Sequence, residues 1–510
     1  MTYLTQLQMK LEKCDMRRRG SITIFASMVI MLVINFLFAL LEASRYTELN
    51  KLAEMRSSSD IESVFSQYCV PLYEEYGLLG YDCQGSSIEG YLASLTADNF
   101  CVERDYLGMK HLNLLRLDLE TADVQGYTLI TDGNGMVYEA AVASYMKENI
   151  AYGTAKAIYD TYIDSVDIGE ANKDVGENVD NAMAELEKLE AGDDDDSSGG
   201  VETIKKTDES EDAVADDTFA SVQKSKASGV LTVVLGKEAE VSGSLINLSN
   251  SVSNRELKEG ANKQIPENDW FDYVCLEQYI LKNMGNYISP KEGRALQYEV
   301  EYIIAGKSSD SDNLKAVVNE LLLAREAANF MYLQSDVKKK EEALVLATAI
   351  AGASANPVVV DVVKQGLLAG WAYCESVLDV RTLLSGEKIP LIKTTSTWTS
   401  ELSEIATLLS GSEKAKTVSN GMSYQDYVGT LLLIKGVEIM SYRAMDIQEA
   451  TVQSKDGYSD FRMDNVISSM DIAFNYEFVP VFYGNYKYGL DGRSFDWCEI
   501  TKQAKYSYFE

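Results

Sequence analysis

The feature that most constrains this chain is an uncharged apolar run, Ile22–Leu41, close to its amino terminus. A helix of about 20 residues extends about 30 Å, which is the thickness of the hydrocarbon core of a bilayer. The run is longer than the apolar region of a secretory signal peptide, and no small-x-small cleavage site follows it. We therefore predict one transmembrane helix over residues 21–43 and favour a retained anchor over a cleaved signal peptide.

A basic segment precedes this run. Residues 1–20 carry five basic and two acidic side chains, and Arg17, Arg18 and Arg19 stand directly before Gly20. Basic flanks stay on the cytoplasmic side of a membrane, so these three arginines are the predicted topology determinants. The prediction is a single-pass protein of the cell membrane, with residues 1–20 as a cytoplasmic tail and the bulk of the chain extracytoplasmic.

The same boundary is similar to the processing site of prepilin-type substrates, in which a peptidase cuts after glycine and leaves the apolar helix intact. Here the cut would fall between Gly20 and Ser21. Pilins usually carry Glu five residues after the cut, whereas this chain has Phe25. Gly20 is therefore either a cleavage position or a helix-boundary residue, and the sequence leaves both interpretations open.

Small side chains inside the span mark where a second membrane helix can approach. Ala26, Ser27 and Ala39 are small enough to allow close contact between helix backbones. The sequence therefore predicts two kinds of neighbour for the span: the lipid of the bilayer and the helices of other membrane proteins.

Composition argues against several classes of function. The formal net charge is −33, and an acidic surface of this kind is repelled by nucleic acid. The chain has one histidine, His111, so metal sites built from several imidazoles are excluded. Without a paired nucleophile motif, His111 is best read as a structural residue. The sequence thus predicts no catalytic residue, metal ligand or cofactor, and the protein is not expected to be an enzyme.

Three further motifs lack the context that their chemistry needs. Gly306-Lys307-Ser308 imitates the end of a phosphate-binding loop, but the first glycine of that loop would fall at Glu301. The four carboxylates of Asp193–Asp196 lack the spacing of a calcium-binding loop. Six cysteines lie after the span and none forms C-x-x-C, so zinc has no support and disulfides remain undecided.

The exterior part of the chain divides by composition into three regions. Residues 44–163 form a membrane-proximal region of mixed helix and strand, in which Asp132-Gly133-Asn134-Gly135 predicts a β-hairpin. Residues 164–228 form an acidic linker that is predicted to be disordered, because residues 164–218 carry 20 acidic side chains, four lysines and no aromatic residue. Residues 229–510 form a mainly helical exterior domain that ends in strands.

Helical periodicity dominates the last region. Apolar residues recur with the spacing of a core-facing helix in DNLKAVVNELLLAREAANFMYL, and Pro357 opens a second long helix. Residues 343–360 are uncharged, but they are rich in alanine and contain glycine and proline, so a buried helix pair is favoured over a second membrane contact. The predicted fold class is α+β, predominantly helical, with one transmembrane helix, a hairpin and C-terminal strands.

Several stretches taken together carry a resemblance to a known family. They are RRRGSITIFASMVIMLVINFLFALLEASR, YEEYGLLGYD, GYTLITDGNGMVYEAAVASYMK, DYVCLEQYILKNMGNY, ALQYEVEYIIAGKSSDSDNLKAVVNELLLAREAANFMYL and GMSYQDYVGTLLLI. They resemble uncharacterised bacterial membrane proteins, a domain of unknown function associated with tight-adherence (type IV-like) pilus and type II secretion loci of Gram-positive bacteria. The amino terminus is similar to pseudopilins.

The resemblance implies that the protein works within a multiprotein system, but it identifies no functional residues. It implies a single-span, pseudopilin-like accessory or minor component of a tight-adherence pilus or type II secretion-like system, which acts through contacts with pilin-type or pilus platform proteins. The alternative is an extracytoplasmic, membrane-tethered cell-wall enzyme or a sensor domain.

Overall fold

The computed structural model describes residues 2–82, 115–147, 156, 221–236, 239–261, 264–351, 357–482 and 498–509. The predicted linker lies outside the described residues as far as residue 220, and its last part, residues 221–227, is helical. His111, Cys83, Cys101 and Asp193–Asp196 also lie outside them.

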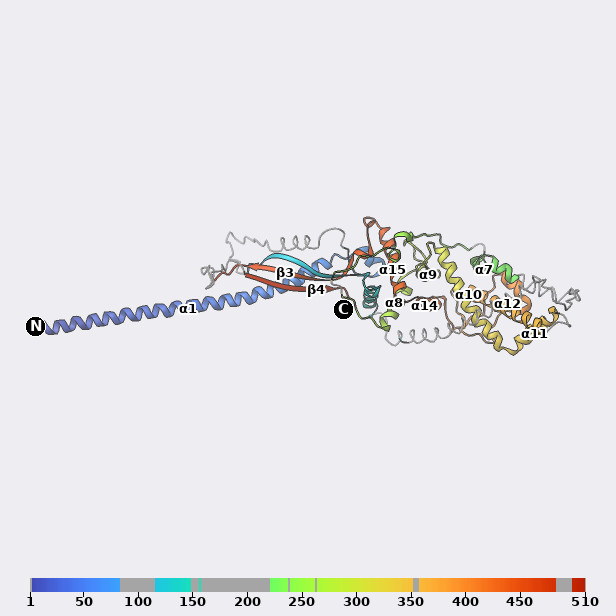
Figure 1. Ribbon diagram of the computed structural model, residues 1–510, viewed down its shortest axis with the longest axis horizontal. Coiled ribbons are helices and arrows are strands. Elements are labelled where there is room, and N and C mark those ends of the chain that lie inside the picture. Colours follow the sequence, from blue (N-terminus) through green and yellow to red (C-terminus); the bar gives the residue numbers. More distant parts are fainter. Residues whose placement is uncertain are drawn as a thin grey trace, which may run out of the picture.

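The molecule is elongated, with a single long helix, α1 (Thr2–Phe65), projecting from one end. A small sheet lies beside the carboxyl-terminal part of α1, and a larger helical region continues away from it (Figure 1). Along the projecting part of α1, the side chains from Ile22 to Phe38 are exposed. In the part of the chain that the structure describes, α1 is the one helix long and apolar enough to cross a membrane, in agreement with the predicted span.

The sheet is antiparallel and has β3 (Val466–Phe478) at its centre. One edge of β3 pairs with β2 (Asp118–Leu129), and the other pairs with β4 (Cys498–Ser507) and, further along, with the short β1 (Tyr81–Asp82). Strands of widely separated sequence therefore meet in one sheet. The expected C-terminal strands are present as β3 and β4.

The carboxyl-terminal half of α1 packs on this sheet along one stripe. Leu49, Ala53, Ile61, Val64 and Phe65 are buried at spacings of three, four and eight residues, which places them on one side of a helix. They form a core with strand residues such as Phe474, Tyr476 and Ile500. The Phe65 ring stacks on Tyr506 at 4.5 Å between ring centroids, and the Tyr508 hydroxyl donates to the Phe65 carbonyl. Helix and sheet are thus joined by an apolar seam.

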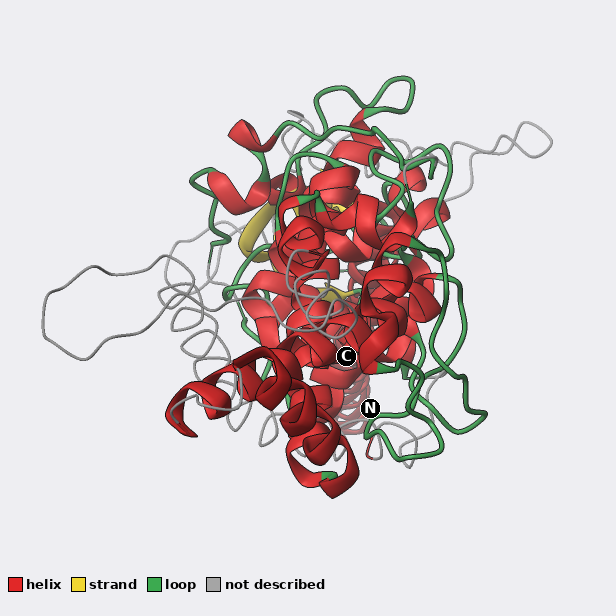
Figure 2. Cartoon of the chain, turned by 90° about the vertical axis from the view of Figure 1, so that its right-hand side faces the viewer, coloured by secondary structure: helices red, strands yellow, loops and turns green. Residues whose placement is uncertain are grey.

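The remaining helices build a second, larger core. The elements are α2 (Val70–Tyr76), α4 (Met136–Met146), α7 (Val230–Leu235), α8 (Trp270–Asn283), α9 (Glu299–Ala305), α10 (Asp310–Ser335), α11 (Val337–Ala351), α12 (Pro357–Leu384), α13 (Ile405–Ser410), α14 (Tyr424–Lys435) and α15 (Val437–Gln453). α12 packs on α10 and α11, and α15 packs on α4, α8 and α9. Viewed along the long axis, helices fill most of the section (Figure 2). The fold is α+β and mostly helical, as predicted.

The predicted hairpin at residues 132–135 is wrong. The turn itself exists, since Gly133, Asn134 and Gly135 all have positive φ. It leads from β2 into α4 rather than into a partner strand, because MVYEAAVASYM buries Val137, Tyr138, Val142 and Met146 on the helical region. The partner of β2 is β3, which lies more than 300 residues further along the chain.

The uncharged stretch 343–360 belongs to the helix pair α11 and α12 as far as it is described. Ala347 packs against Val363 and Leu367 in a small cluster between the two helices. Residues 352–356, which connect them, lie outside the described residues.

Replacing Phe65 with Ala should loosen the seam between α1 and the sheet. The change removes a wholly buried ring that contacts Tyr81, Tyr506 and Tyr508, and losses of about 3–5 kcal/mol are typical of such truncations. Urea unfolding of the detergent-solubilised full-length protein measures the effect. The matched control is Met55→Ala on the same helix, where the side chain is 70% exposed; equal losses for the two variants would contradict the seam.

Candidate functional site

The predicted processing and topology residues lie within the unbroken helix α1. Gly20 and Ser21 are helical and cause no interruption. The side chains of Arg17, Arg18 and Arg19 lie outside the described residues. The boundary between the basic tail and the apolar run is therefore a point on a continuous helix.

The three small residues predicted to mediate helix packing do not share one face of α1. Successive residues of a helix are rotated by about 100°, so Ala26 and Ala39 point to nearly opposite sides. Ala26 and Ser27 are exposed and Ala39 is half-buried. The Ser27 hydroxyl donates to the carbonyl of Ile24 at 2.8 Å, so it is satisfied within its own helix. Any helix contact through these residues would involve more than one side of the span.

At the carboxyl end of the apolar run, α1 carries an ion pair that the sheet covers. Arg45 donates to Glu42 at 2.7 Å, and the Arg45 side chain is only 4% exposed. The Arg45 guanidinium lies 5.5 Å from the centre of the Phe478 ring, which ends β3. Glu42 also accepts a hydrogen bond from the backbone N–H of Phe482 at 3.0 Å. This junction joins α1 to the last residue of β3 and to the segment that follows it.

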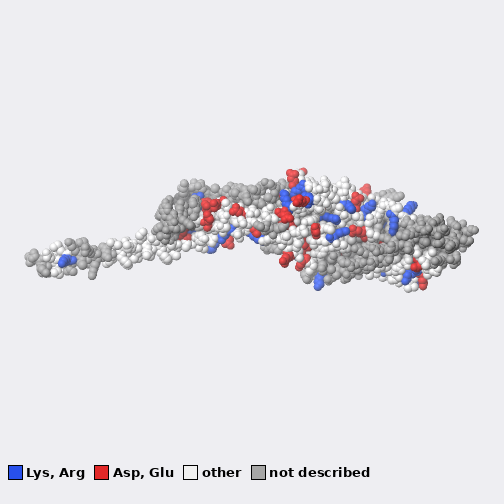
Figure 3. Space-filling model, viewed as in Figure 1, with Lys and Arg blue, Asp and Glu red and all other residues white. Residues whose placement is uncertain are grey.

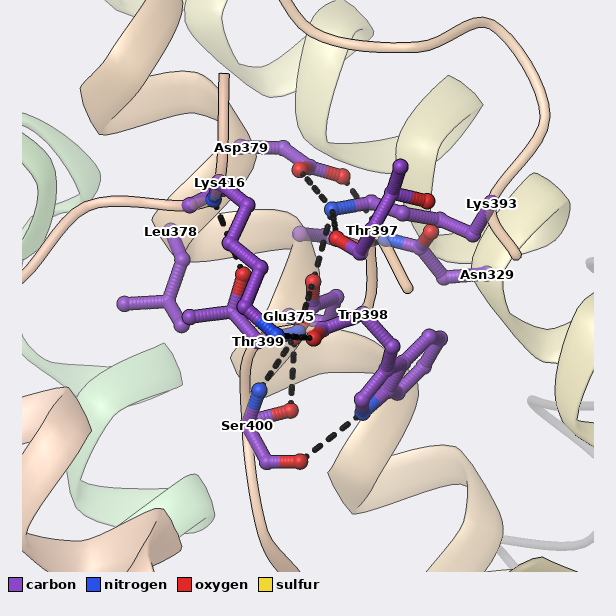
Figure 4. Close-up of polar contacts among 12 residues, drawn as sticks. Asn329, Glu375, Leu378, Asp379, Lys393, Thr397, Trp398, Thr399, Ser400 and Lys416 are labelled. Carbon is purple, nitrogen blue, oxygen red and sulfur yellow. Dashed lines mark hydrogen bonds and ion pairs between the residues drawn. The ribbon is translucent and has the colours of Figure 1, made fainter. Parts of the chain in front are cut away.

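The helical region contains a buried cluster of charged side chains, shown in Figure 4. The Lys393 ammonium lies 2.6 Å from Glu375 and 2.7 Å from Asp379, and all three side chains are wholly buried. Glu375 and Asp379 are one turn apart on α12, whereas Lys393 comes from the loop after it. Arg325 of α10 pairs with Asp379 at 3.0 Å. Two cations and two carboxylates thus balance each other.

Hydrogen bonds occupy much of the remaining polar surface of this cluster. Glu375 accepts from the backbone N–H of Ser400 at 2.8 Å and from its hydroxyl at 2.7 Å, while Asn329 donates to Asp379 at 3.0 Å. The indole N–H of Trp398 donates to the Ser400 carbonyl at 2.9 Å. A cluster this deeply buried leaves no face for a substrate, so it fastens the loop 388–400 to α10 and α12.

A cleft of about 600 Å³ lies between the segment 221–236, the end of α12 and α13. Arg381 lines this cleft. The Arg381 guanidinium donates hydrogen bonds to the backbone carbonyls of Leu408 at 2.8 Å and Val233 at 2.9 Å. The described lining is partly apolar, with Val234, Leu235 and Leu409, and its remaining polar groups are mainly hydroxyl and ammonium groups, from Ser228, Ser410, Lys224 and their neighbours. These groups suit binding of a polar ligand rather than acid–base chemistry between carboxylates.

The phosphate-loop mimic and the described cysteines have structural roles. Gly306 ends α9 in a left-handed conformation at φ 66°, and the following N–H of Lys307 donates to Asn313. Of the six cysteines after the apolar run, those that the structure describes, Cys69, Cys275, Cys374 and Cys498, are free thiols. Burial raises the pKa of the Cys374 thiol to about 12, so this thiol stays protonated and unreactive at neutral pH.

Sequence reasoning missed several buried titratable groups, among them three glutamates whose pKa rises to about 7. Burial raises the pKa of Glu301 to about 7, although hydrogen bonds from the Tyr424 hydroxyl and the Tyr287 N–H act in the opposite direction. The second carboxylate oxygen of Glu301 is buried without a hydrogen-bond partner, which fits a protonated acid. Burial likewise raises the pKa of Glu139 and of Glu277 to about 7.

A family model described as a family of unknown function, DUF5702, matches residues 208–478, a little over half of the chain. The match includes α7 to α15 and β3, with the buried charge cluster and the cleft, and it begins after α1 and β2. No curated protein and no solved structure matches the chain.

Removing the ammonium of the buried cluster should destabilise the helical region strongly. Lys393→Met leaves Glu375 and Asp379 with only one cation, and breaking a buried pair by losing one partner costs about 3–5 kcal/mol. Urea unfolding of the detergent-solubilised full-length protein measures this. The control is Lys414→Met, whose partner Glu387 is 46% exposed and whose pair contributes about 0–1 kcal/mol. A Lys393→Met variant as stable as the control would refute the structural role of the cluster.

The buried glutamates predict that stability falls as the pH rises. Their folded-state pKa values lie above the ordinary value of 4.5, so the folded state binds more protons than the unfolded state. The stabilisation is complete below pH 4.5 and is lost as the pH rises through 7, with a slope of up to about 1.4 kcal/mol per pH unit for each group. Glu301→Gln should lower the loss measured by urea unfolding between pH 5 and pH 8.

The control for this experiment is Glu341→Gln, at an exposed position on α11. It should show the same decline between pH 5 and pH 8 as the unaltered protein. If Glu301→Gln and Glu341→Gln have identical pH profiles, Glu301 is not a protonated acid in the folded state.

Proposed function

The chain belongs to the family of unknown function DUF5702, and we propose that it is a single-span, pseudopilin-like accessory or minor component of a tight-adherence pilus or type II secretion-like system. In this proposal the amino terminus is cytoplasmic, the bulk of the chain is extracytoplasmic, and the protein acts through contacts with pilin-type or pilus platform proteins rather than as an enzyme.

The observation that carries this proposal is the continuity of α1. One helix runs from the apolar span into the seam with the sheet. A plain anchor needs only a flexible tether, whereas a continuous helix fixed by buried side chains transmits the position of the span to the exterior domain. This geometry suits a component whose membrane helix packs among others while its exterior domain makes protein contacts.

The surface of the span also supports contacts with other helices. Its large apolar side chains, such as Phe25, Leu32 and Phe36, are exposed, and the run Ile22–Leu41 contains no charged residue, so the described part of the projecting helix next to the body is white in Figure 3. In a bilayer such a surface is covered by lipid or by neighbouring helices. The similarity of the amino terminus to pseudopilins supports the second kind of neighbour.

The cleft beside Arg381 favours one alternative, an extracytoplasmic, membrane-tethered cell-wall enzyme or sensor domain. Its size is sufficient for a small polar ligand. The described lining residues supply lysines and hydroxyls but no pair of carboxylates, which is what most glycosidases use. A role in protein contacts therefore remains the first proposal.

Replacing residues 22–41 with polyleucine should keep the protein in the membrane but abolish its role in pilus assembly or pilus-linked secretion. Polyleucine preserves hydrophobic length while it removes the specific side-chain surface of the span. A photoreactive amino acid at position 32 of the unaltered full-length protein should crosslink to a pilin-type or platform protein. Position 323, exposed on α10, is the control for the crosslinker.

Two results would contradict the proposal. Full restoration of assembly by the polyleucine variant would mean that the span is only an anchor. Restoration of the deleted strain by the exterior part alone, together with its hydrolysis of cell-wall glycan, would establish the enzyme alternative.

A further inference from the structure

The end of β3 and the residues after it return to α1 at the place where the helix leaves its apolar run. The Phe482 ring stacks on Phe38 with 6.0 Å between ring centroids and 25° between ring planes. The Phe482 N–H donates to Glu42 at 3.0 Å. One turn further along α1, Phe478 contacts Arg45 and Tyr46. The segment 478–482 therefore runs along α1 toward its amino terminus.

These contacts fix the level of the segment relative to the span. Phe38 lies three residues before Leu41, the last residue of the apolar run, which corresponds to about 4–5 Å along a helix. Wherever α1 crosses a bilayer through this run, the Phe482 ring beside Phe38 must lie at the same depth. Interfacial apolar segments enter a membrane by about 5–10 Å, so this depth is the one expected for such a segment.

The side chains of the segment suit lipid rather than water. Val479 is 44% exposed and Val481 is 42% exposed, on either side of the buried Pro480. Proline lacks an N–H group and so ends the pairing of β3. The backbone N–H of Phe482 is satisfied by Glu42, which removes one cost of bringing backbone into the interface.

On α1 and in the sheet, apolar residues give way to charged residues at the same height along the long axis of α1. On α1 the change comes at Glu42 and Arg45, just after the apolar run. In the sheet it comes at Glu477 and Glu499, which pair in register, with Glu120 close by. Figure 3 shows acidic side chains at the end of the molecule's body nearest the projecting helix. Residues 479–482 follow directly after the charged level in the sheet, and Phe482 lies beside Phe38 in the apolar run of α1.

We propose that residues 479–482 insert into the lipid interface beside the carboxyl end of the α1 span. The exterior domain then touches the membrane at a second place, held against α1 by the Phe38–Phe482 and Glu42–Phe482 contacts, and it cannot rotate freely about the anchor. This inference requires α1 to span the membrane but does not require the pilus role.

A fluorescent amino acid sensitive to its environment, placed at position 481 of the full-length protein in nanodiscs, tests the insertion. The nanodiscs contain phosphatidylcholine with a doxyl quencher near the top of the acyl chain; zwitterionic lipid avoids repulsion by the three glutamates. Position 32, in the span, and position 323, on α10, are the two references. We expect strong quenching at 32, about twofold quenching at 481 and none at 323.

Each outcome decides between the occupants of this surface. Emission at 481 that matches the water-exposed position 323, with quenching at 32, would overturn the insertion while leaving the span intact. Blue-shifted emission at 481 without quenching by lipid would overturn it too, because the segment would then be covered by another protein. No quenching at 32 would overturn the span itself and the insertion with it.

A pair of variants adds a second measurement. With the fluorescent residue at position 479, Val481→Asp should abolish quenching by the doxyl lipid, because a carboxylate resists entry into the interface. Val481→Leu is the matched control and should retain it. Equal quenching in the two variants would overturn the proposal.

Discussion

The apolar seam between α1 and the sheet is the interaction on which the rest of the architecture depends. A helix that leaves a membrane has no reason to continue straight into water unless its next turns are stabilised, because isolated helices are marginal. Here Leu49, Ala53 and Ile61 pack against the strands at helical spacing. The same packing gives β3 and β4 one covered face. Anchor and domain are therefore a single folded unit rather than two parts joined by a tether.

The parts of the fold that could be predicted from the sequence are those that depend on local patterns, and the strand pairing beneath the seam is not one of them. The span, the long helices and the final strands depend on local patterns, namely hydrophobic length, the 3.6-residue period and alternation. The pairing of β2 with β3 depends on contacts between residues such as Val124 and Ile472, and no local pattern specifies a partner at that separation. The wrong prediction of a hairpin after Gly133 has the same cause. The turn is present, but the residues that follow it form α4 instead of a strand paired with β2.

The candidate site was less accessible to prediction than the fold. Charged residues such as Lys393, Glu375 and Asp379 normally indicate surface, and their spacing in the sequence gives no sign that they meet in the core. The i, i+4 spacing of Glu375 and Asp379 was a usable signal, but a chain with 79 acidic residues contains many such pairs. What distinguishes this pair is that Lys393, from the loop after α12, and Arg325, from α10, meet it in the core, and those positions result from tertiary packing.

The family match covers only part of the elements that form the seam between α1 and the sheet. The matched residues 208–478 contain α7 to α15 and β3, but α1, α2, β2, α4 and β4 lie outside them. β3 is thus the element that connects the matched region to the anchor, through strand pairing on both edges and through the contacts of its end with α1. The end of β3 points toward the apolar run of α1, so this one strand links the helical region to the part of α1 that follows the run. In the proposed role in an assembly, this link would connect contacts made by the helical region to the orientation of the membrane helix.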